Sequence, residues 1–410
     1  MNENKNPLVS IIIPVYNDAE FLHESLDSAV NQTLKNIEII CVNDSSTDNS
    51  HEIINEYAEK DSRVKVINRL SNGGTLIARK DGAAAAQGIF TMFLDSNDYL
   101  ALNACETAYN LIVKNDVDIL EFSYSVNEYD EEGNVSNVQV LGTDGEQFFD
   151  SQEEIQNFYF LNDSASGNLR AEIFKTELIK LAFSKIDNFY CSFDADSCAM
   201  FYVIYYASKM KRAVTEPLYF EKAETGIKEI SVDKFEQYCR QKSLAAELIR
   251  KFLEREGTLE AQEKYLLAWQ DKAIKACCLY YVKNVKKENF DAVVDILLSS
   301  WNEKENAEKI TLHFLTELRK YINLTTELDN RRKELLAQME NDEKSARIKE
   351  LQAFCEEQDR EKERFLQEIA RKDEKISELE SAAVLSSKVY NAARKIKNLL
   401  RKIPAKIFRH

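Results

Sequence analysis

Short apolar runs alternate with stretches of helical periodicity along the first 127 residues. Mainly apolar runs of four to seven residues predict buried strands at 9–15, 37–42, 64–67 and 90–94. The segments between them, 18–31, 47–60 and 75–87, place apolar residues on one helical face. Strands that alternate with helices predict right-handed βαβ units, and therefore an α/β fold with a mainly parallel sheet. A further helix at 102–114 and a strand at 117–124 would extend this arrangement.

The pattern changes after residue 150. Residues 151–220 are mixed, with helical stretches at 153–160, 175–183 and 196–210, and an all-helical pattern runs from 226 to about 323. Residues 324–382 contain no glycine or proline, and eight of the twelve a and d heptad positions from 348 to 386 are apolar. This seam predicts a coiled coil that would join two chains as a homodimer. A long single helix packed on the rest of the protein remains the alternative.

The composition favours a globular, helix-rich chain of two to four structural units. The 410 residues are 44% apolar, with 10 glycines and 4 prolines, which excludes a disordered or collagen-like chain. No apolar run reaches the roughly 18–20 residues that a membrane span needs. The first residues lack the pattern of a secretory signal, so we expect a cytoplasmic protein. The eight cysteines form no CxxC pair and histidines number only four, so we expect reduced thiols and no zinc site.

Charge is distributed unevenly along the chain. The net charge is −16, and residues 381–410 carry eight Lys or Arg and no acid, which leaves −24 for the other 380 residues. An acidic body argues against nucleic acid as a partner. Between 385 and 409, apolar residues recur at i, i+3, i+4 and i+7 with the cations beside them. We therefore expect a basic amphipathic helix that binds the inner face of an anionic membrane, or else docks on the protein's own acidic body.

Polar residues follow three of the predicted strands. They are 14–17 (PVYN), 43–48 (NDSSTD) and 95–98 (DSND), and the segment 72–74 (NGG) with Arg79 lies between the last two. Ligands of open α/β sheets bind beyond the carboxyl ends of the strands, so these residues should surround one crevice. Hydrogen-bonding groups, an arginine and carboxylates that can bind a hard cation suit a nucleoside diphosphate with Mg²⁺ or Mn²⁺.

The order and spacing of these motifs resemble those of family 2 glycosyltransferases with the GT-A fold. The stretches VSIIIPVYN, NQTLKNIEIICVNDSSTDNS, SNGGTLIARKDG and FLDSNDYL cover residues 7–127, and weaker similarity continues through IFKTELIKLAF, FDADSCAMFYVIYYASK and EPLYFEK. The resemblance implies a GT-A domain at 1–222. The helical domain (223–323), the coiled coil (324–382) and the basic helix (383–410) would follow it. The implied reaction transfers a sugar, with inversion, from a nucleotide donor that is usually UDP-linked to an envelope or surface glycan.

The resemblance also implies which residues bind the nucleotide. They are Pro14, Tyr16, Asp44 and Arg79. Tyr16 would flank the base, and Asp44 would accept a hydrogen bond from the uracil ring. Arg79 would lie near the diphosphate.

Metal and catalytic roles follow from the same resemblance. Asp95 and Asn97 belong to the motif whose Mn²⁺ or Mg²⁺ bridges the donor phosphates and neutralises the leaving group. Asp196 stands where the family has its catalytic base, which would take the proton from the acceptor hydroxyl. Asp194, two residues earlier, is the alternative base.

Six positions depart from the family pattern, and all of them lie in the site motifs. They are Ala19, Ser45, Lys80, Asn97, Glu172 and Ala195. Asn97 leaves one fewer negative charge on the cation, which Asp98 would compensate. Glu172 stands where relatives commonly have lysine, and a carboxylate there would repel a diphosphate. Two functions therefore stay open, an active transferase and a catalytically degenerate scaffold that binds a partner through its helical half.

Overall fold

A computed structural model describes residues 6–129, 135–142, 144–162, 169–193, 195–223, 230–284, 290–301 and 313. These residues belong to two compact units, Met1–Gly226 with Gln241–Gln270, and Ile227–Arg240 with Asp271–His410. The two units interleave along the chain, and the domain boundaries at 222, 323 and 382 stay predictions. The coiled coil expected at 324–382 and the basic helix expected at 383–410 lie outside the described residues.

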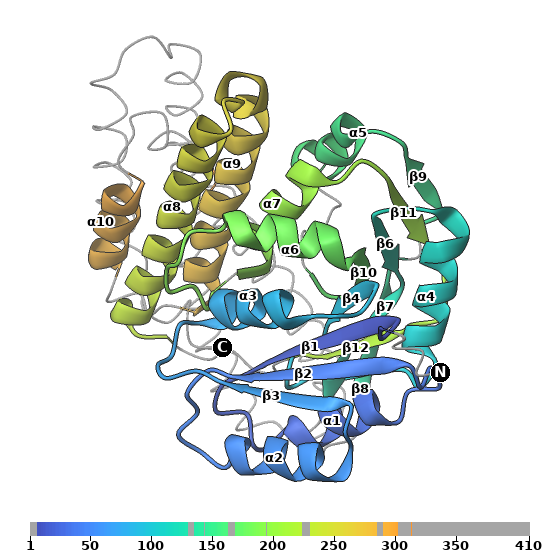
Figure 1. Ribbon diagram of the computed structural model, residues 1–410. Coiled ribbons are helices and arrows are strands. Elements are labelled where there is room, and N and C mark those ends of the chain that lie inside the picture. The colour runs from blue at the N-terminus through green and yellow to red at the C-terminus, as the bar shows by residue number, and fades with distance from the viewer. Residues whose placement is uncertain are drawn as a thin grey trace, which may run out of the picture. The chain divides into compact units, whose positions relative to one another are not determined.

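An eight-stranded sheet is the framework of the first unit (Figure 1). In sheet order its strands are β3 (Val64–Asn68), β2 (Ile37–Asn43), β1 (Val9–Val15), β4 (Phe90–Phe93), β10 (Glu172–Lys175), β6 (Ile119–Phe122), β11 (Met210–Ala213) and β9 (Gln147–Phe149). The first four are parallel, as are β6 and β11, whereas β10 runs antiparallel between β4 and β6. Strand β9 is antiparallel to β11. The predicted α/β architecture with a mainly parallel sheet is therefore confirmed.

Helices connect the parallel strands as the sequence predicted. They are α1 (Leu22–Val30), α2 (Ser50–Lys60), α3 (Thr75–Ala85) and α4 (Ala104–Asn115). Three further helices and a short π-helix follow, namely α5 (Gln152–Gln156), η1 (Asn157–Leu161), α6 (Thr176–Lys185) and α7 (Ala195–Tyr206). The helix expected at 196–210 is wrong at its end, because α7 stops at Tyr206 and Met210 begins β11.

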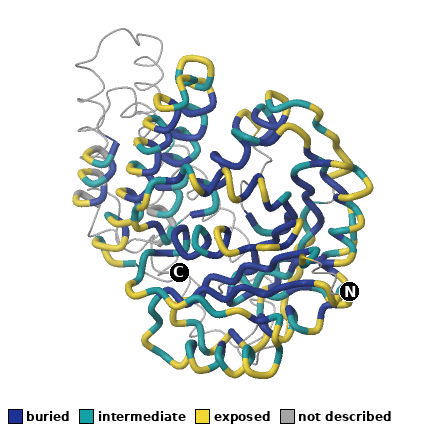
Figure 2. The backbone as a smooth tube through the Cα atoms, viewed as in Figure 1, coloured by how far each residue is buried: buried dark blue, intermediate teal, exposed yellow. Residues whose placement is uncertain are grey.

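Apolar side chains cover both faces of the central strands, which explains why β1 reads as one continuous apolar run. All seven residues of β1 are buried (Figure 2). Ile11 and Ile13 belong to a core shared with residues of α1 and α4. Ile12 points to the other face, where Gly82 of α3 lies so close that a Cβ would collide with the Ile12 side chain. Glycine at this position therefore allows α3 to pack directly on the sheet.

A second, four-stranded sheet was not predicted. Its order is β5 (Tyr99–Leu100), β12 (Tyr219–Lys222), β7 (Tyr124–Tyr129) and β8 (Val135–Leu141). The single strand expected at 117–124 divides at Ser123 into β6 and β7, which belong to different sheets. The Ser123 hydroxyl donates to the backbone oxygen of Gly142 at 3.0 Å, next to the end of β8. This second sheet brings Tyr219 and Glu221 of β12 to the carboxyl end of β4.

The pattern after residue 226 is helical in the described residues, as expected. The helices are α8 (Val232–Arg255), α9 (Leu259–Asn284) and α10 (Phe290–Ser300). In the second unit, Cys277 and Cys278 are buried, and the rings of Tyr238 and Tyr280 stack with centroids 4.4 Å apart. Within the described residues, no helix combines the length and the apolar character that a membrane span requires.

Candidate active site

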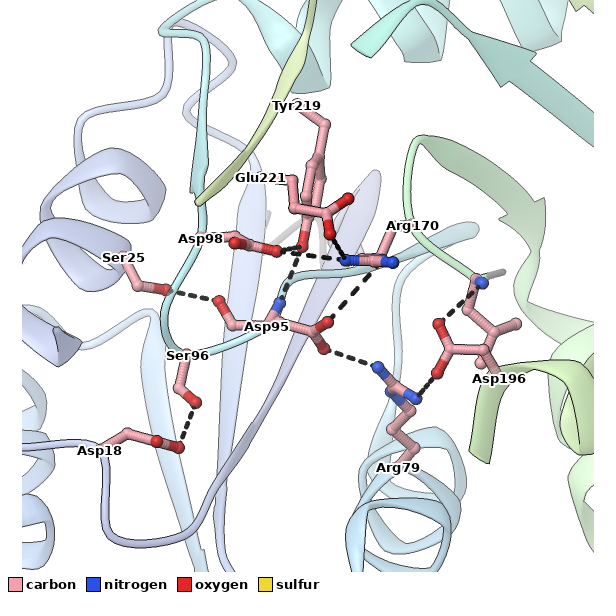
Figure 3. Close-up of polar contacts among 11 residues, drawn as sticks. Asp18, Ser25, Arg79, Asp95, Ser96, Asp98, Arg170, Asp196, Tyr219 and Glu221 are labelled. Carbon is pink, nitrogen blue, oxygen red and sulfur yellow. Dashed lines mark hydrogen bonds and ion pairs between the residues drawn. The ribbon is translucent and has the colours of Figure 1, made fainter. Parts of the chain in front are cut away.

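Asp95, Arg79 and Asp196 meet at the carboxyl ends of the parallel strands, although they come from three separate elements (Figure 3). Asp95 follows β4, Arg79 lies on α3, and Asp196 lies in the first turn of α7. Arg79 donates through Nη2 to Asp95 Oδ1 at 2.6 Å and through Nη1 to Asp196 Oδ1. One guanidinium thus joins the residues that the resemblance assigned to the metal and to the base.

The Arg79 side chain is charged and almost completely buried, with 2% of its surface exposed. Burial alone would lower the pKa of a guanidinium, but Asp196 and Asp95 outweigh this effect and raise it above its usual value. The ring of Phe93 lies 5.9 Å from the guanidinium carbon and adds a cation–π contact. Both carboxylates are therefore fixed in position by a buried charge.

Asp196 is an ionised carboxylate with few free acceptor directions. Its Oδ2 accepts a hydrogen bond from the backbone N–H of Leu169 at 3.2 Å. Burial would raise the pKa of Asp196, but the charges of Arg79 and Arg170 and the Leu169 N–H bring it below its usual value. The carboxylate is consequently ready to accept a proton at neutral pH, although it is a weaker base than an unpaired aspartate. Its alternative, Asp194, lies outside the described residues.

Asp44 is buried directly after β2, where it binds the glycine loop before α3. Its carboxylate accepts hydrogen bonds from the backbone N–H groups of Gly73 at 2.9 Å and Gly74 at 2.8 Å. Arg69 Nε lies 2.8 Å from Asp44 Oδ1. Gly74 has φ +82°, and a Cβ at this residue would lie 2.6 Å from the backbone oxygen of Cys191. Asp44 and the loop therefore determine each other's conformation.

Tyr16 lies just beyond β1, with 44% of its surface exposed. The backbone of the next residue, Asn17, has φ +56°, and its side-chain oxygen accepts a hydrogen bond from Thr47 N at 2.7 Å. This turn places the Tyr16 ring at the same edge of the sheet as Asp44. Pro14 is the penultimate residue of β1 and is buried in the sheet.

Asp98 belongs to the same acidic loop but is turned away from solvent. Its carboxylate accepts hydrogen bonds from the Tyr219 hydroxyl at 2.6 Å and from Lys222 N at 2.9 Å. Burial and the nearby charge of Asp95 raise the pKa of Asp98 to about 7. Asn97, between them, is partly exposed. We expected Asp98 to supply the negative charge that Asn97 lacks. The Asp98 carboxylate, however, already accepts hydrogen bonds from Tyr219 and Lys222 of the second sheet.

Arg170 is a site residue that the sequence did not indicate. Its Nη1 lies 2.9 Å from Glu221 Oε1 and 3.9 Å from Asp98 Oδ2, and its Nε lies 4.0 Å from Asp95 Oδ2 (Figure 3). Burial would lower its pKa, but the surrounding carboxylates raise it. In the sequence Arg170 is only a lone cation shortly before an apolar strand, and no motif marks it.

A divalent cation fits the charges of this site. The carboxylates of Asp95, Asp196 and Glu221 outnumber the guanidinium groups of Arg79 and Arg170, even without Asp98, whose pKa is raised. Asp95 Oδ2 has only the distant Arg170 contact at 4.0 Å, so it can serve as a ligand. No three His, Cys, Asp or Glu side chains gather as a ready-made metal site in the described part of the chain. Such a donor set suits an ion that takes most of its ligands from water and substrate phosphates.

Glu172 lies in the protein interior rather than on an exposed surface of the site. It is 2% exposed and its carboxyl group accepts a hydrogen bond from the Tyr159 hydroxyl at 2.5 Å. Burial, and then the charge of Glu121 opposite it on β6, raise the pKa of Glu172 well above its usual value. A raised pKa favours the protonated, uncharged form, which would weaken the expected repulsion of a diphosphate.

The described cysteines, two histidines and Trp269 lie outside the cluster of Arg79, Asp95 and Asp196 and contact other parts of the protein. The described cysteines are buried, and none of them forms a disulfide. His23 contacts Tyr57 and His51 contacts Asn55, both on helix surfaces. Trp269 is buried, and its indole N–H donates to the backbone oxygen of Ser197 at 3.0 Å.

Comparisons with known proteins agree with the motifs. Residues 10–174 match the model of glycosyl transferase family 2. The chain is 43% identical over 114 residues to glycosyltransferase EpsJ of Bacillus subtilis (strain 168), which covers 28% of this chain and 33% of that protein. It is 45% identical over 114 residues to the poly(ribitol-phosphate) beta-glucosyltransferase of Bacillus spizizenii. This alignment covers 27% of this chain and 18% of that protein.

The similarity is confined to part of each protein. The matched segment spans a third or less of the length of these two relatives. Among solved structures, TarS of S. aureus aligns with a TM-score of 0.49 and 17% identity over 74% of this chain and 51% of that chain.

Proposed function

We propose that residues 10–174, which match the model of glycosyl transferase family 2, form a domain of that family, and that the protein transfers a sugar, with inversion, from a UDP-linked donor to an envelope or surface glycan. The observation that carries the proposal is the Asp95–Arg79–Asp196 cluster. It lies beyond the carboxyl ends of parallel strands, where open α/β sheets bind ligands.

Asp196 is the proposed general base. Its lowered pKa leaves it ionised at neutral pH, and Arg79 and Leu169 N fix its position. The carboxylate accepts the proton of the acceptor hydroxyl as that oxygen attacks the anomeric carbon. The attack comes from the face opposite the diphosphate, so the configuration at that carbon inverts. Asp194 stays the alternative base.

Asp95 and Asn97 are the proposed protein ligands of Mn²⁺ or Mg²⁺. Asp95 Oδ2 is the available carboxylate oxygen, and Asn97 offers a side-chain carbonyl on the same partly exposed loop. When bound, the ion supplies positive charge to the donor phosphates. Few protein ligands mean that ion and donor bind together rather than separately.

Tyr16 and Asp44 are the proposed nucleotide-binding residues beside Pro14 and Arg79. The exposed Tyr16 ring offers a flat surface for the base. Asp44 already accepts N–H groups from Gly73 and Gly74, so it would share its remaining acceptor capacity with a uracil N–H. It also shapes the loop beside the nucleotide.

The acceptor and the location follow from the relatives and the tail. The Bacillus spizizenii relative is named for a ribitol-phosphate polymer, which favours a polyanionic surface glycan or glycoconjugate as the acceptor class. Residues 385–409 would attach the protein to the inner face of an anionic membrane, and residues 324–382 would join two copies. Both are proposals from the sequence.

Isothermal calorimetry with UDP and UDP-sugars, with and without Mn²⁺, tests the function. Binding of UDP together with hydrolysis or transfer of the donor sugar supports the enzyme. The rival is a scaffold, favoured by the fact that Asp44 and Asp196 are already engaged by protein groups. Absence of nucleotide binding by the full-length chain would support this rival.

A further inference from the structure

Two guanidinium groups lie beside the Asp95 carboxylate, and they differ in exposure. Arg79 is 2% exposed and donates to both Asp95 and Asp196. Arg170 is 23% exposed, and its distances to Asp95 and Asp98 are 4.0 and 3.9 Å. Arg79 is therefore committed to protein carboxylates, whereas part of the Arg170 side chain is accessible to solvent.

Arg170 has hydrogen-bond donors that the described residues do not use. Among these residues its close partner is Glu221, at 2.9 Å from Nη1. Its Nε is buried and has no hydrogen-bond partner in the described part of the chain. A guanidinium has five N–H donors arranged in a plane that matches the oxygens of a phosphate. The unused donors therefore suit a bound anion with several oxygens.

The location of Arg170 matches the place of a diphosphate bound with the ion at Asp95. Arg170 precedes β10, which pairs with β4, and Asp95 follows β4. Glu221 of β12 lies on the other side of the guanidinium.

We propose that Arg170 binds the donor diphosphate and stabilises the negative charge that develops on it as the sugar leaves. Arg79, proposed above as part of the nucleotide site, would act there indirectly, by positioning Asp95 and Asp196. The proposal rests on the function proposed above. A guanidinium that is already placed beside the leaving group stabilises charge without rearrangement during the reaction. Glu221 is the positioning residue for Arg170.

The test is calorimetric titration of the full-length protein with uridine, UMP and UDP at saturating Mn²⁺. Loss of one charge-assisted hydrogen-bonding group weakens binding by roughly 10- to 100-fold. We expect Arg170→Gln to weaken UDP binding by about this factor and uridine binding by less than twofold. Arg170→Lys should regain part of the UDP affinity, because it restores the charge without the planar fork.

Arg63→Gln is the matched control. The Arg63 side chain is 24% exposed and pairs with Asp61 at 2.6 Å, but it precedes β3 at the opposite end of the strands. This variant should bind UDP as the parent does. Equal loss of uridine and UDP affinity in Arg170→Gln, or an unchanged UDP affinity, would overturn the proposal. Failure of the parent protein to bind UDP would instead contradict the proposed function.

Discussion

Arg79 and Asp196 are 117 positions apart in the sequence, yet the buried guanidinium of Arg79 donates directly to the Asp196 carboxylate. The same guanidinium reaches Asp95 at 2.6 Å. Because the three residues come from α3, the β4 loop and α7, this contact ties the start of α7 to the edge of the parallel sheet. The proposed base and the proposed metal ligand therefore share one buried cation.

The first prediction concerns the stability that Arg79 provides. Arg79→Gln removes the charge between two carboxylates and should lower the free energy of unfolding by about 3–5 kcal/mol. Arg63→Gln breaks a partly exposed pair and should cost less than about 1 kcal/mol. Urea denaturation of both variants gives the comparison. Equal costs would mean that burial of Arg79 does not strengthen its ion pairs.

The second prediction concerns the base. Asp196→Asn should reduce sugar transfer by about 10²- to 10⁴-fold, the range for loss of a general base. Affinity for UDP should stay within a few-fold, because the base acts on the acceptor. Initial rates and calorimetry on the same preparation separate these effects. Full activity in this variant would move the role to Asp194.

The third prediction concerns the loop that Asp44 binds. Gly74→Ala places a Cβ at φ +82° and within 2.6 Å of the Cys191 oxygen, so it should destabilise the protein by several kcal/mol. Gly257→Ala is the control variant. Gly257 also has a positive φ, at +69°, but no atom lies within 4 Å of the Cβ that alanine would add. This variant should cost only about 1–2 kcal/mol. Thermal unfolding measures both, and similar losses would show that the Cys191 contact relaxes freely.

Much of the fold could be predicted because burial on both faces gives strands an unmistakable apolar run. Strand β1 has this pattern, and its predicted bounds agree with the structure. Strand β10 has four residues, and its pairing partners are distant in sequence, so no local signal reveals its place between β4 and β6. The second sheet was not predicted for the same reason, since its strand β5 has only two residues and gives no local signal.

Of the site residues, only those that lie in sequence motifs could be predicted. Asp44, Arg79, Asp95 and Asp196 carry motif signals, and the structure brings Arg79, Asp95 and Asp196 into contact. Arg170 carries no motif signal. Its place in the site depends on Glu221 and Asp98, which are distant in sequence and lie near it only in the folded structure. The electrostatic role of a residue depends on its neighbours in space, and the spacing of residues in the sequence does not show which residues these are.

The fourth prediction concerns the cation. Asn97→Asp adds a carboxylate to a partly exposed loop beside Asp95, so Mn²⁺-dependent UDP binding should tighten by about tenfold. Binding of Mn²⁺ without UDP should stay weak in the parent, because no three His, Cys, Asp or Glu side chains gather as a metal site in the described residues. Titration of UDP at several Mn²⁺ concentrations measures both. An unchanged dependence on Mn²⁺ would show that Asn97 does not contact the ion.

The last prediction links Glu172 to the pH dependence of stability. Burial raises the pKa of Glu172 well above its usual value, with further contributions from the charges of Glu121 and Asp196, while the Tyr159 hydroxyl and Arg212 oppose the rise. The folded protein therefore keeps a proton on Glu172 that the unfolded chain releases near pH 4.3. Stability from this group is fully present below that pH and is lost as the pH rises toward the folded pKa.

Glu172→Gln should remove this dependence, because the amide resembles the protonated acid and can still accept the Tyr159 hydrogen bond. The variant and the parent should be about equally stable near pH 4–5, and the variant should gain at higher pH by up to about 1.4 kcal/mol per pH unit. Urea denaturation across pH 5–8 measures the difference. Glu121→Gln is a contrasting variant, since it removes the negative charge 2.9 Å from Arg212 Nη2 and should destabilise the protein across this range. A constant difference between parent and Glu172→Gln would mean that Glu172 is ionised in the folded protein, and that its negative charge is tolerated beside Glu121.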